Sequence, residues 1–485
     1  MTLDPVDPHL FVIFGASGDL TRRKLIPSIF RVITEDGAAA AHNLLGVSRR
    51  PWSDAEFREY TNRALLEAGY DGSLVEEWCR QRVFYHQMAP ASADLDSLRG
   101  RIETIEAELG LAGNRVFYLA LPPVAFNTVV DQLGKAGLAS GPGWTRLVVE
   151  KPFGHDQATA HQLNDQIHAH FDEHQVYRID HYLGKETVQN LLAFRFSNLL
   201  FESAWNRDRV EAIEITVAES LGAEGRAGYY DKAGVIRDMV QNHITQLISL
   251  IAMEAPNAFE ADEIRSQKVD VLESISPIEA ESVVYGQYQA GLIDGESVPG
   301  YRDDPEVTAG STTPTFVAMR LNIANRRWEG VPVYVRTGKR LPRKTTQIAV
   351  VFRRPPVCIF HGVQDECTSH HNVIILTLQP NEGFELRFDV KAPGSPLTLL
   401  SLPLRFDYDE AFARLPDAYQ TLILDVMEGD QTLFVRSDEV ETSWALYTPL
   451  LEMDLPVLPY SAGSWGPDEV NERLGLRDGW IMRPE

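Results

Sequence analysis

The sequence predicts two differently built halves: a doubly wound α/β half, then an α+β half with a large, mostly antiparallel sheet. Apolar runs alternate with amphipathic stretches from residue 9 to about 180, which is typical of βα units around a parallel sheet. Beyond that point few helices separate the apolar runs, which indicates an antiparallel sheet with helices on one face. Because single cores rarely exceed roughly 250–300 residues, we divide the 485 residues into domains 1–180 and 181–485.

Each expected element has a local signal. The strands are short apolar runs, and those of the first half are each followed by a stretch that reads as helix. In the first half they are Leu10–Phe14, Asn43–Val47, Val83–His86, Val116–Leu121 and Arg146–Val149. In the second half they are Val210–Ala218, Phe316–Asn322, Val331–Thr337, Gln347–Phe352, Val373–Leu378 and Phe384–Val390. A long helix is expected from Val235 to about Met253, and a Gly/Asp/Pro-rich surface loop from Ile293 to Thr313.

The composition excludes several classes of function. The 45 basic and 69 acidic residues give a formal charge of −24, which argues against nucleic acid or an anionic membrane as a partner. The cysteines are Cys79, Cys358 and Cys367, and their spacing suits neither a disulfide framework nor a metal site. The sequence contains no signal-like segment and no apolar run of the ~18 residues needed to span a bilayer. We therefore expect a cytoplasmic protein without a bound metal.

A glycine turn follows the first strand. Phe11–Phe14 runs directly into Gly15-Ala16-Ser17-Gly18-Asp19-Leu20, and residues 21–33 read as a helix. In this arrangement the glycines let the backbone approach a pyrophosphate, and the helix N-terminus offers it N–H groups and a positive dipole. Thr21 stands where G-x-G-x-x-G has its third glycine, so the motif alone also fits an ordinary tight βα turn. Its context predicts a Rossmann-like dinucleotide site.

The end of the second strand indicates which dinucleotide is bound. An acidic residue there would accept the ribose 2′-OH of NAD, whereas an arginine would hold the 2′-phosphate of NADP. The strand ends Ser48-Arg49-Arg50, and no carboxylate occurs before Asp54. NADP is therefore favoured, with NAD as the weaker alternative, and Arg50 either assists or is solvated.

Two further strand ends carry candidate residues. Open α/β sheets bind ligands at the carboxyl ends of their strands. Glu150-Lys151 closes the fifth strand and Leu121-Pro122 closes the fourth. Position alone makes Lys151 a site candidate, while the proline pair at 122–123 also fits a loop that is merely rigid.

The segment 178–186 places a carboxylate, an imidazole, a phenol and an ammonium around one tight turn. It reads Arg-Ile-Asp-His-Tyr-Leu-Gly-Lys-Glu. His181 and Lys185 are four residues apart, so a helical turn would place both on one face, where they could grip an anion such as a phosphate. Asp180 and His181 are neighbours and must serve different partners. The alternative interpretation is a solvated polar turn.

A second candidate segment lies on the expected long helix, where residues 237–243 read Arg-Asp-Met-Val-Gln-Asn-His. The step from Asp238 to His243 rotates by roughly 140° about an α-helix, so these two side chains should not hydrogen-bond each other. A histidine can take the proton of a hydroxyl while a hydride leaves the same carbon. On its own, however, His243 is more often a core histidine.

Several of these segments resemble one family. The string at 178–186 resembles the signature of the glucose-6-phosphate dehydrogenase family without one departure. Residues 228–231 and 237–243 resemble that family's catalytic segment, and 335–344 resembles its second lysine pair. At least five motifs occur in the family order, so the resemblance covers nearly the whole chain.

The resemblance implies roles for individual residues. It implies His243 as the general base, with Asp180 as the carboxylate that fixes its tautomer and stabilises the imidazolium. The substrate contacts that we predict are Lys151, His181, Tyr182, Lys185, Glu219, Asp238, Lys339 and Lys344. The predicted cofactor contacts are Gly15, Ala16, Ser17, Gly18, Asp19, Leu20, Lys24, Arg49, Leu121, Pro122, Glu150 and Lys151.

The implied reaction oxidises D-glucose 6-phosphate at C1 to 6-phospho-D-glucono-1,5-lactone and reduces NADP, the entry to the oxidative pentose phosphate pathway. The resemblance also implies a homodimer or homotetramer built through the large sheet. Two rival functions are an NAD(P) enzyme acting on another hexose phosphate and a redox-sensing or scaffold relative that binds NADP without turnover.

Overall fold

The computed structural model describes residues 6–35, 42–88, 95–357, 359, 370–394, 397–412 and 415–484. Cys358 and Cys367 lie outside these ranges. The chain forms two compact units. The first unit is Met1–Lys185 with Pro256–Ser266 and Pro416–Glu441, and the second is Glu186–Ala255, Gln267–Leu415 and Thr442–Glu485. The domain boundary expected at residue 180 stays a prediction.

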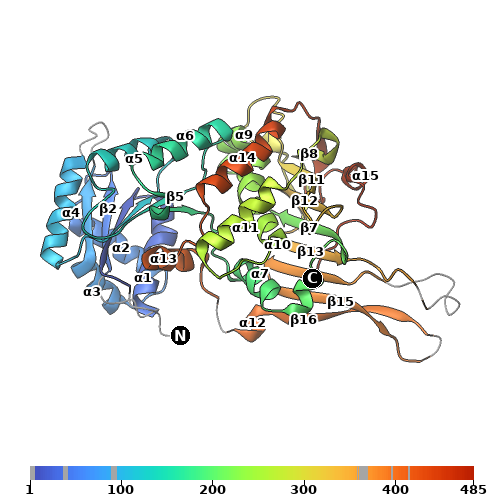
Figure 1. Ribbon diagram of the computed structural model, residues 1–485. Coiled ribbons are helices and arrows are strands. Elements are labelled where there is room, and N and C mark those ends of the chain that lie inside the picture. The colour runs from blue at the N-terminus through green and yellow to red at the C-terminus, as the bar shows by residue number, and fades with distance from the viewer. Residues whose placement is uncertain are drawn as a thin grey trace. The chain divides into compact units, whose positions relative to one another are not determined.

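A six-stranded parallel sheet forms the centre of the first unit (Figure 1). The strands are β1 His9–Phe14, β2 His42–Ser48, β3 Val83–Gln87, β4 Arg115–Leu119, β5 Thr145–Glu150 and β6 Val176–Ile179. They lie in the order β3-β2-β1-β4-β5-β6, so the winding reverses between β1 and β4, where such sheets bind their ligands. The predicted doubly wound fold is confirmed. The sequence analysis did not find β6, because four residues that include a buried arginine give no alternating pattern.

Helices pack against this sheet, and the buried side chains of the helices and strands together form the hydrophobic core of the unit. Those of the first 185 residues are the π-helical η1 Thr21–Leu25, α1 Ile26–Glu35, α2 Asp54–Glu67, α3 Gly72–Arg82, α4 Leu95–Leu109, η2 Pro123–Ala125, α5 Phe126–Lys135, α6 Gln157–His168 and η3 Glu173–Gln175. Helix α13, Ala418–Glu428, also belongs to this unit although it lies far along the chain. Its Leu422, Ile423 and Val426 are buried in one cluster with residues of α1 and β1.

The second unit contains a nine-stranded sheet in the order β16-β15-β14-β13-β7-β12-β11-β8-β17. The strands are β7 Val210–Ala218, β8 Val283–Gln289, β11 Phe316–Asn322, β12 Pro332–Gly338, β13 Thr345–Phe352, β14 Val373–Gln379, β15 Gly383–Lys391, β16 Leu399–Asp407 and β17 Val457–Ser461. Only the β7–β12 and β8–β17 pairs of this sheet are parallel. This confirms the predicted mostly antiparallel sheet. Strands β8, β16 and β17 were not predicted from the sequence.

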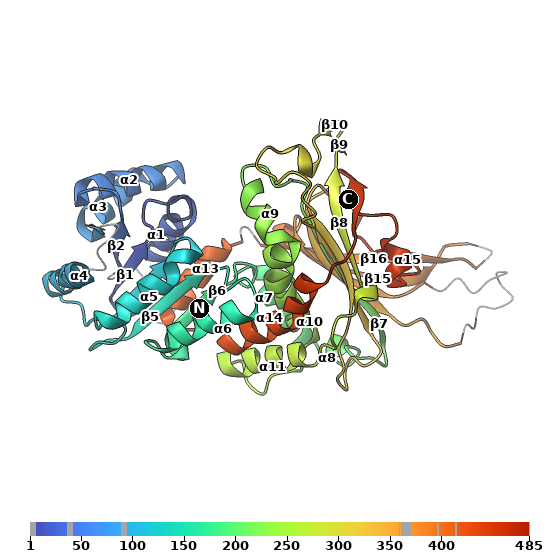
Figure 2. The same cartoon turned by 90° about the horizontal axis from the view of Figure 1, so that it is seen from above.

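Helices α9 and α10 lie together on one side of this sheet (Figure 2). The helices that start in the second unit are α7 Glu186–Phe196, α8 Leu199–Glu202, α9 Ala227–Val235, η4 Ile236–Ile244, α10 Thr245–Ala252, η5 Ala280–Ser282, η6 Tyr301–Asp303, α12 Tyr408–Ala411 and α15 Val470–Leu474. Helices α11 Ala261–Glu273 and α14 Ser437–Glu452 each run from one unit into the other.

Two expected elements differ from the structure. The helix expected from Val235 to Met253 is composite, because the π-helical segment η4 precedes the α-helix α10. A kink at Gly234, which has φ 66°, lies just before it. The expected surface loop 293–313 contains strand β10, Glu296–Val298, which pairs with β9, Gly291–Ile293. It also contains Tyr301, which is fully buried. Its glycines, aspartates and prolines signalled turns, but not the packing between them.

None of the helices in the described ranges is both long and apolar enough to cross a membrane.

Candidate active site

The glycine turn adopts the conformation that its sequence predicts. Gly15 has φ +87°, and a Cβ there would lie 2.1 Å from the carbonyl oxygen of Ala120 and 3.4 Å from Cδ2 of Leu121. The turn therefore needs a residue without a side chain at position 15. It also brings two predicted cofactor segments together, residues 15–20 after β1 and Leu121-Pro122 after β4.

The backbone of this turn offers hydrogen-bond donors to an anion. The N–H groups of Gly15 and Ala16 donate to Val47, and the bond from Arg22 N–H to the Gly18 carbonyl closes the first helical turn. No side chain caps the segment η1 that follows. The first N–H groups of a helix have no acceptor within the helix, so those that open the helix after Gly18 can bind an anion. Together with the close approach at Gly15, this fits the pyrophosphate of a dinucleotide.

The end of β2 presents two exposed arginines. A buried tyrosine fixes the backbone here: the Tyr85 hydroxyl donates to the Arg50 carbonyl at 2.7 Å and lies 2.7 Å from Oγ of Ser48. Arg49 is exposed, and the Arg50 guanidinium lies 4.9 Å from the centre of the Trp52 ring. Both cations can therefore meet a 2′-phosphate beside the glycine turn.

Glu150 ends β5 among phenol groups. The hydroxyls of Tyr118 and Tyr419 donate to its Oε1 at 2.6 and 3.2 Å. Burial raises the pKa of Glu150, while the two phenol donors and the charge of Lys151 act in the opposite direction. The carboxylate is thus committed to tyrosines of β4 and α13, and Lys151 follows it at the strand end.

The signature 178–186 forms a hydrogen-bonded turn between β6 and α7. Oδ1 of the buried Asp180 accepts the Tyr182 N–H at 3.0 Å, and its carbonyl accepts the Leu183 N–H at 3.0 Å. Lys185 N–H donates to the Tyr182 carbonyl at 3.2 Å, and the helix begins at Glu186. The tight turn is as predicted, and consecutive turns rather than a helix shape it.

Aromatic rings organise the polar side chains of this turn. The Tyr182 ring lies edge-on to His181 at 5.2 Å, and the Lys185 ammonium is 4.3 Å from the same ring. His181 also lies parallel to Tyr419 of α13, with ring centres 6.4 Å apart. A Cβ on Gly184 would lie 2.4 Å from the Ala418 carbonyl, so only glycine lets α13 pack this closely. The imidazole and the ammonium therefore share one aromatic neighbour, an arrangement that suits a phosphate.

Lys24, on η1, forms an ion pair with Asp417 at 2.7 Å. Asp417 also caps α13 by accepting the Tyr419 N–H at 3.0 Å. The pair links the glycine-turn helix to the segment that carries Tyr419, all within the first unit.

His243 lies in the second unit on the π-helix η4 and is 2% exposed. The predicted rotation of 140° from Asp238 to His243 is wrong, because it assumed an α-helix. A π-helix bonds each residue to the fifth along, which brings residues five apart towards one face. Thr245 Oγ1 bonds to the Val240 carbonyl with this same spacing, at 2.7 Å. π-Helical turns are frequent at functional sites, and the other π segment of the described chain carries Lys24.

Lys339 joins two other predicted substrate residues of the second unit. Its ammonium lies 2.6 Å from Oε2 of Glu219 and 3.5 Å from Oδ2 of Asp238. Glu219 and Lys339 follow the parallel strands β7 and β12, whose last residues are paired. Lys344 is exposed, and within the described ranges no contact joins it to this cluster.

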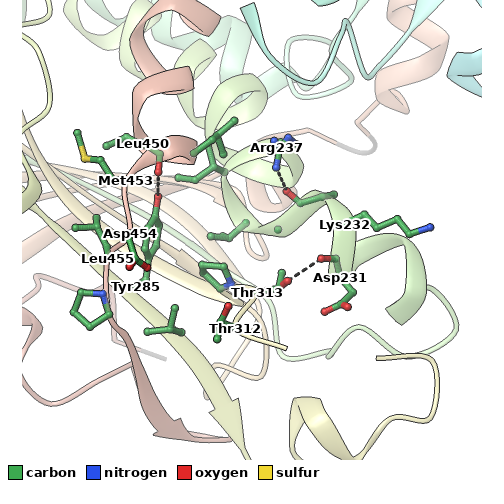
Figure 3. Close-up of a pocket in the computed structure, with 18 residues that line it drawn as sticks. Asp231, Lys232, Arg237, Tyr285, Thr312, Thr313, Leu450, Met453, Asp454 and Leu455 are labelled. Atoms are coloured by element: carbon green, nitrogen blue, oxygen red, sulfur yellow. Dashed lines mark hydrogen bonds between the residues drawn. The ribbon is translucent and has the colours of Figure 1, made fainter. Parts of the chain in front are cut away.

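A pocket of about 450 Å³ opens at the kink between α9 and η4 (Figure 3). Its walls come from residues 231–237, Tyr285, residues 312–314, residues 450–451 and residues 453–457. The Tyr285 hydroxyl donates to the Leu450 carbonyl at 3.3 Å, and Lys232 extends away from both. The pocket contains none of the predicted site residues, although Arg237 immediately precedes Asp238.

The sequence analysis missed several residues of these clusters. Tyr118, Tyr419 and Asp417 carry no local motif, and two of them reach the site only because α13 folds back onto the parallel sheet. Tyr230 lies inside a recognised segment, but nothing in that segment indicates that its ring faces Lys339 at 4.9 Å.

Comparison with known proteins gives full-length matches. The family model described as "Glucose-6-phosphate dehydrogenase, NAD binding domain" matches residues 12–190, and the model for the C-terminal domain matches residues 192–480. The glucose-6-phosphate 1-dehydrogenase of Chlamydia muridarum is 42% identical, over 99% of this chain and 98% of that protein. The enzyme of the same name from Aggregatibacter actinomycetemcomitans is 42% identical, over 97% and 96%.

Solved structures of glucose-6-phosphate dehydrogenases also match this chain along its whole length. A glucose-6-phosphate dehydrogenase in complex with its substrate glucose-6-phosphate has a TM-score of 0.91 and 36% identity, covering 99% of this chain and 100% of that one. A glucose-6-phosphate 1-dehydrogenase from Mycobacterium avium has a TM-score of 0.83 and 30% identity, with 99% of both chains covered.

Proposed function

This chain belongs to the glucose-6-phosphate dehydrogenase family, and we propose that it oxidises D-glucose 6-phosphate at C1 to 6-phospho-D-glucono-1,5-lactone with NADP as the hydride acceptor. One observation carries this: the substrate-complexed relative matches this chain along its whole length. The reaction places the chain at the entry to the oxidative pentose phosphate pathway.

His243 is the proposed general base. It takes the proton of the C1 hydroxyl while the hydride leaves C1, and NADP, when bound, supplies the acceptor for that hydride. Burial at 2% exposure keeps water away from the imidazole, and a histidine titrates near enough to neutral pH for this task. Asp180 is the proposed carboxylate that stabilises the imidazolium, a pairing that rests on the family resemblance.

The remaining residues bind the sugar phosphate. Glu219 and Asp238 are acceptors and Lys339 is a donor, a combination that suits the hydroxyls of a hexose. Around the signature turn, the imidazole and the ammonium flanking Tyr182 supply the charge-assisted bonds that a phosphate needs. The proposed phosphate and sugar contacts are His181, Tyr182, Lys185, Lys151, Glu219, Asp238, Lys339 and Lys344. Because the chain carries a formal charge of −24, it needs such a local group of cations to bind an anionic substrate.

NADP is the proposed cofactor rather than NAD because two arginines follow β2 and no carboxylate occurs before Asp54. The proposed place of the pyrophosphate is the glycine turn and the start of the helix that follows it, and Arg49 is proposed to hold the 2′-phosphate. Lys24, Glu150 and the Leu121-Pro122 backbone complete the proposed cofactor contacts.

We also propose a homo-oligomer, dimer or tetramer, working in the cytoplasm. The edge strand β16 supports the assembly, because Leu400, Leu402 and Leu404 are 44, 46 and 59% exposed. Residues two apart on a strand share one face, so these leucines form an apolar stripe of the kind that oligomers cover.

The direct test follows absorbance at the NADPH band with purified protein, a panel of hexose phosphates and each oxidised cofactor in turn. Glucose 6-phosphate with NADP should give the highest kcat/KM. A higher value for another hexose phosphate would favour the first rival function. Tight NADP binding without turnover of any sugar would favour a non-enzymatic relative.

A further inference from the structure

The ammonium of Lys339 has an aromatic neighbour as well as its two carboxylates. Its Nζ lies 4.9 Å from the centre of the Tyr230 ring. Tyr230 is 3% exposed, and the Lys339 side chain is 12% exposed. An ammonium within about 6 Å of a ring face is attracted by the ring's quadrupole, more strongly where water is excluded.

The backbone of Lys339 is held separately from its side chain. Its N–H donates to the Thr315 carbonyl at 3.0 Å, and its own carbonyl accepts the Tyr460 hydroxyl at 2.6 Å. Neither bond involves Tyr230. A change at Tyr230 therefore acts on the ammonium and leaves the main chain of Lys339 anchored.

The carboxylates alone cannot hold the ammonium while a sugar binds. Glu219 accepts a hydrogen bond from Lys339 and Asp238 forms a longer ion pair with it, yet both carboxylates are proposed to accept hydroxyls of the hexose. Each such exchange weakens a restraint on Lys339, whereas a ring face has no lone pair or proton to give to the sugar. Burial, and next the charge of Asp238, raise the pKa of Tyr230 well above its usual value, so the phenol stays neutral beside the carboxylates.

We propose that Tyr230 is a positioning residue that keeps the Lys339 ammonium aligned for glucose 6-phosphate while Glu219 and Asp238 exchange their contacts with Lys339 for contacts with the sugar. The inference rests on the proposed function and deepens it, because it assigns the organisation of the sugar subsite to a residue outside the predicted set. In this proposal the aromatic ring of Tyr230 aligns the ammonium. The hydroxyl, 3.5 Å from the Pro314 carbonyl, contributes little.

The test compares steady-state kinetics of Tyr230→Phe and Tyr230→Leu. The phenylalanine variant keeps the ring face, so its KM for glucose 6-phosphate should stay within about twofold of the wild type. The leucine variant should raise that KM about five- to thirtyfold, with the KM for NADP unchanged. Equal behaviour of the two variants, or a leucine variant within twofold of the wild type, overturns the proposal.

Tyr301→Leu is the matched control for lost packing. Tyr301 is fully buried and lies edge-on to Tyr230, with ring centres 6.2 Å apart, and its hydroxyl donates to Asp231 at 2.9 Å. The Tyr301→Leu variant should lower the thermal unfolding midpoint but should not selectively raise the KM for glucose 6-phosphate. A rise as large as that of Tyr230→Leu would reduce Tyr230 to a core residue.

A double-mutant cycle with Lys339→Gln isolates the pair. Once the ammonium is absent, adding Tyr230→Leu should change the KM for glucose 6-phosphate less than twofold. If the two substitutions instead raise the KM by factors that multiply in the double variant, Tyr230 and Lys339 are not coupled and the proposal is refuted. Should Tyr230→Leu fail to fold, Tyr230→Met fills more of the ring's volume without a π face and takes its place. Wild-type turnover of glucose 6-phosphate is the positive control, and its absence overturns the proposed function rather than the coupling.

Discussion

At the scale of single residues, the proposed chemistry depends most on His243. Asparagine at this position keeps a polar side chain but removes the proton acceptor. We expect His243→Asn to lower kcat by at least ~10²–10⁴-fold, while glucose 6-phosphate and NADP still bind. Steady-state kinetics with calorimetric binding measures both. His42→Asn replaces another buried histidine and should leave kcat unchanged; a His243→Asn enzyme within a few-fold of the wild type would rule out the base.

Arg49 is the residue proposed to separate NADP from NAD. Alanine removes a charge-assisted contact made only to the 2′-phosphate, so the KM for NADP should rise about ten- to a hundredfold and that for NAD should barely change. Arg63→Ala is the control, because Arg63 is 63% exposed and pairs with Glu59 on α2. Equal losses with both cofactors would contradict the assignment.

At the scale of elements, the β1 glycine turn can be tested with two glycines of equal φ. Gly15 and Gly69 both have φ +87°, but an added Cβ meets the Ala120 carbonyl at 2.1 Å only at Gly15. Gly15→Ala should raise the KM for NADP and NAD alike, at least tenfold, because strain of about 1–2 kcal/mol combines with a backbone clash. Gly69→Ala carries the same strain without the clash. It should cost stability but leave both KM values in place.

Strand β7 also carries a buried carboxylate that makes stability depend on pH. Glu214 is 4% exposed and accepts the Ile481 N–H at 2.7 Å. Burial raises its pKa to about 7, partly opposed by the Ile481 bond and Arg336. The folded chain thus holds this proton more firmly than the unfolded chain. The stabilising contribution is complete below pH 4.5 and is lost as pH rises towards 7, by about 3 kcal/mol in all.

Glu214→Gln should remove that dependence. Relative to the wild type, the variant should gain stability between pH 5 and 8, measured as the difference in free energy of unfolding from denaturant titrations at each pH. Glu211→Gln, at an exposed position of the same strand, controls for the loss of one charge. Parallel profiles for the wild type and Glu214→Gln would show that Glu214 does not titrate in this window.

At the scale of the whole molecule, β16 is the proposed contact between copies of the chain. An edge strand with an apolar stripe invites pairing or packing with another surface. Leu402→Glu with Leu404→Glu should lower the mass found by sedimentation velocity towards that of the 54.4 kDa chain, with the fold retained. Leu292→Glu, at a 63% exposed leucine on β9, is the control. An unchanged oligomer would place the interface elsewhere.

Elements with a local signal could be predicted from the sequence alone. The apolar run 11–14, the glycines after it and the arginines after β2 are contiguous, so the cofactor turn could be predicted in place. The signature turn at 178–186 was likewise predicted, because its residues contact one another within a few positions. The resemblance then supplied the family and the reaction.

Contacts between residues far apart in the chain, by contrast, could be seen only in the folded structure. Glu219 and Lys339 lie together because β7 and β12 pair in parallel, 120 residues apart. Tyr419 reaches His181 because α13 packs against Gly184. The π-helical form of η4 could not be predicted either, because nine residues are too few for an apolar pattern to distinguish a π-helix from an α-helix. Local patterns record which face of an element is buried, whereas long-range pairing depends on contacts that no window of sequence contains.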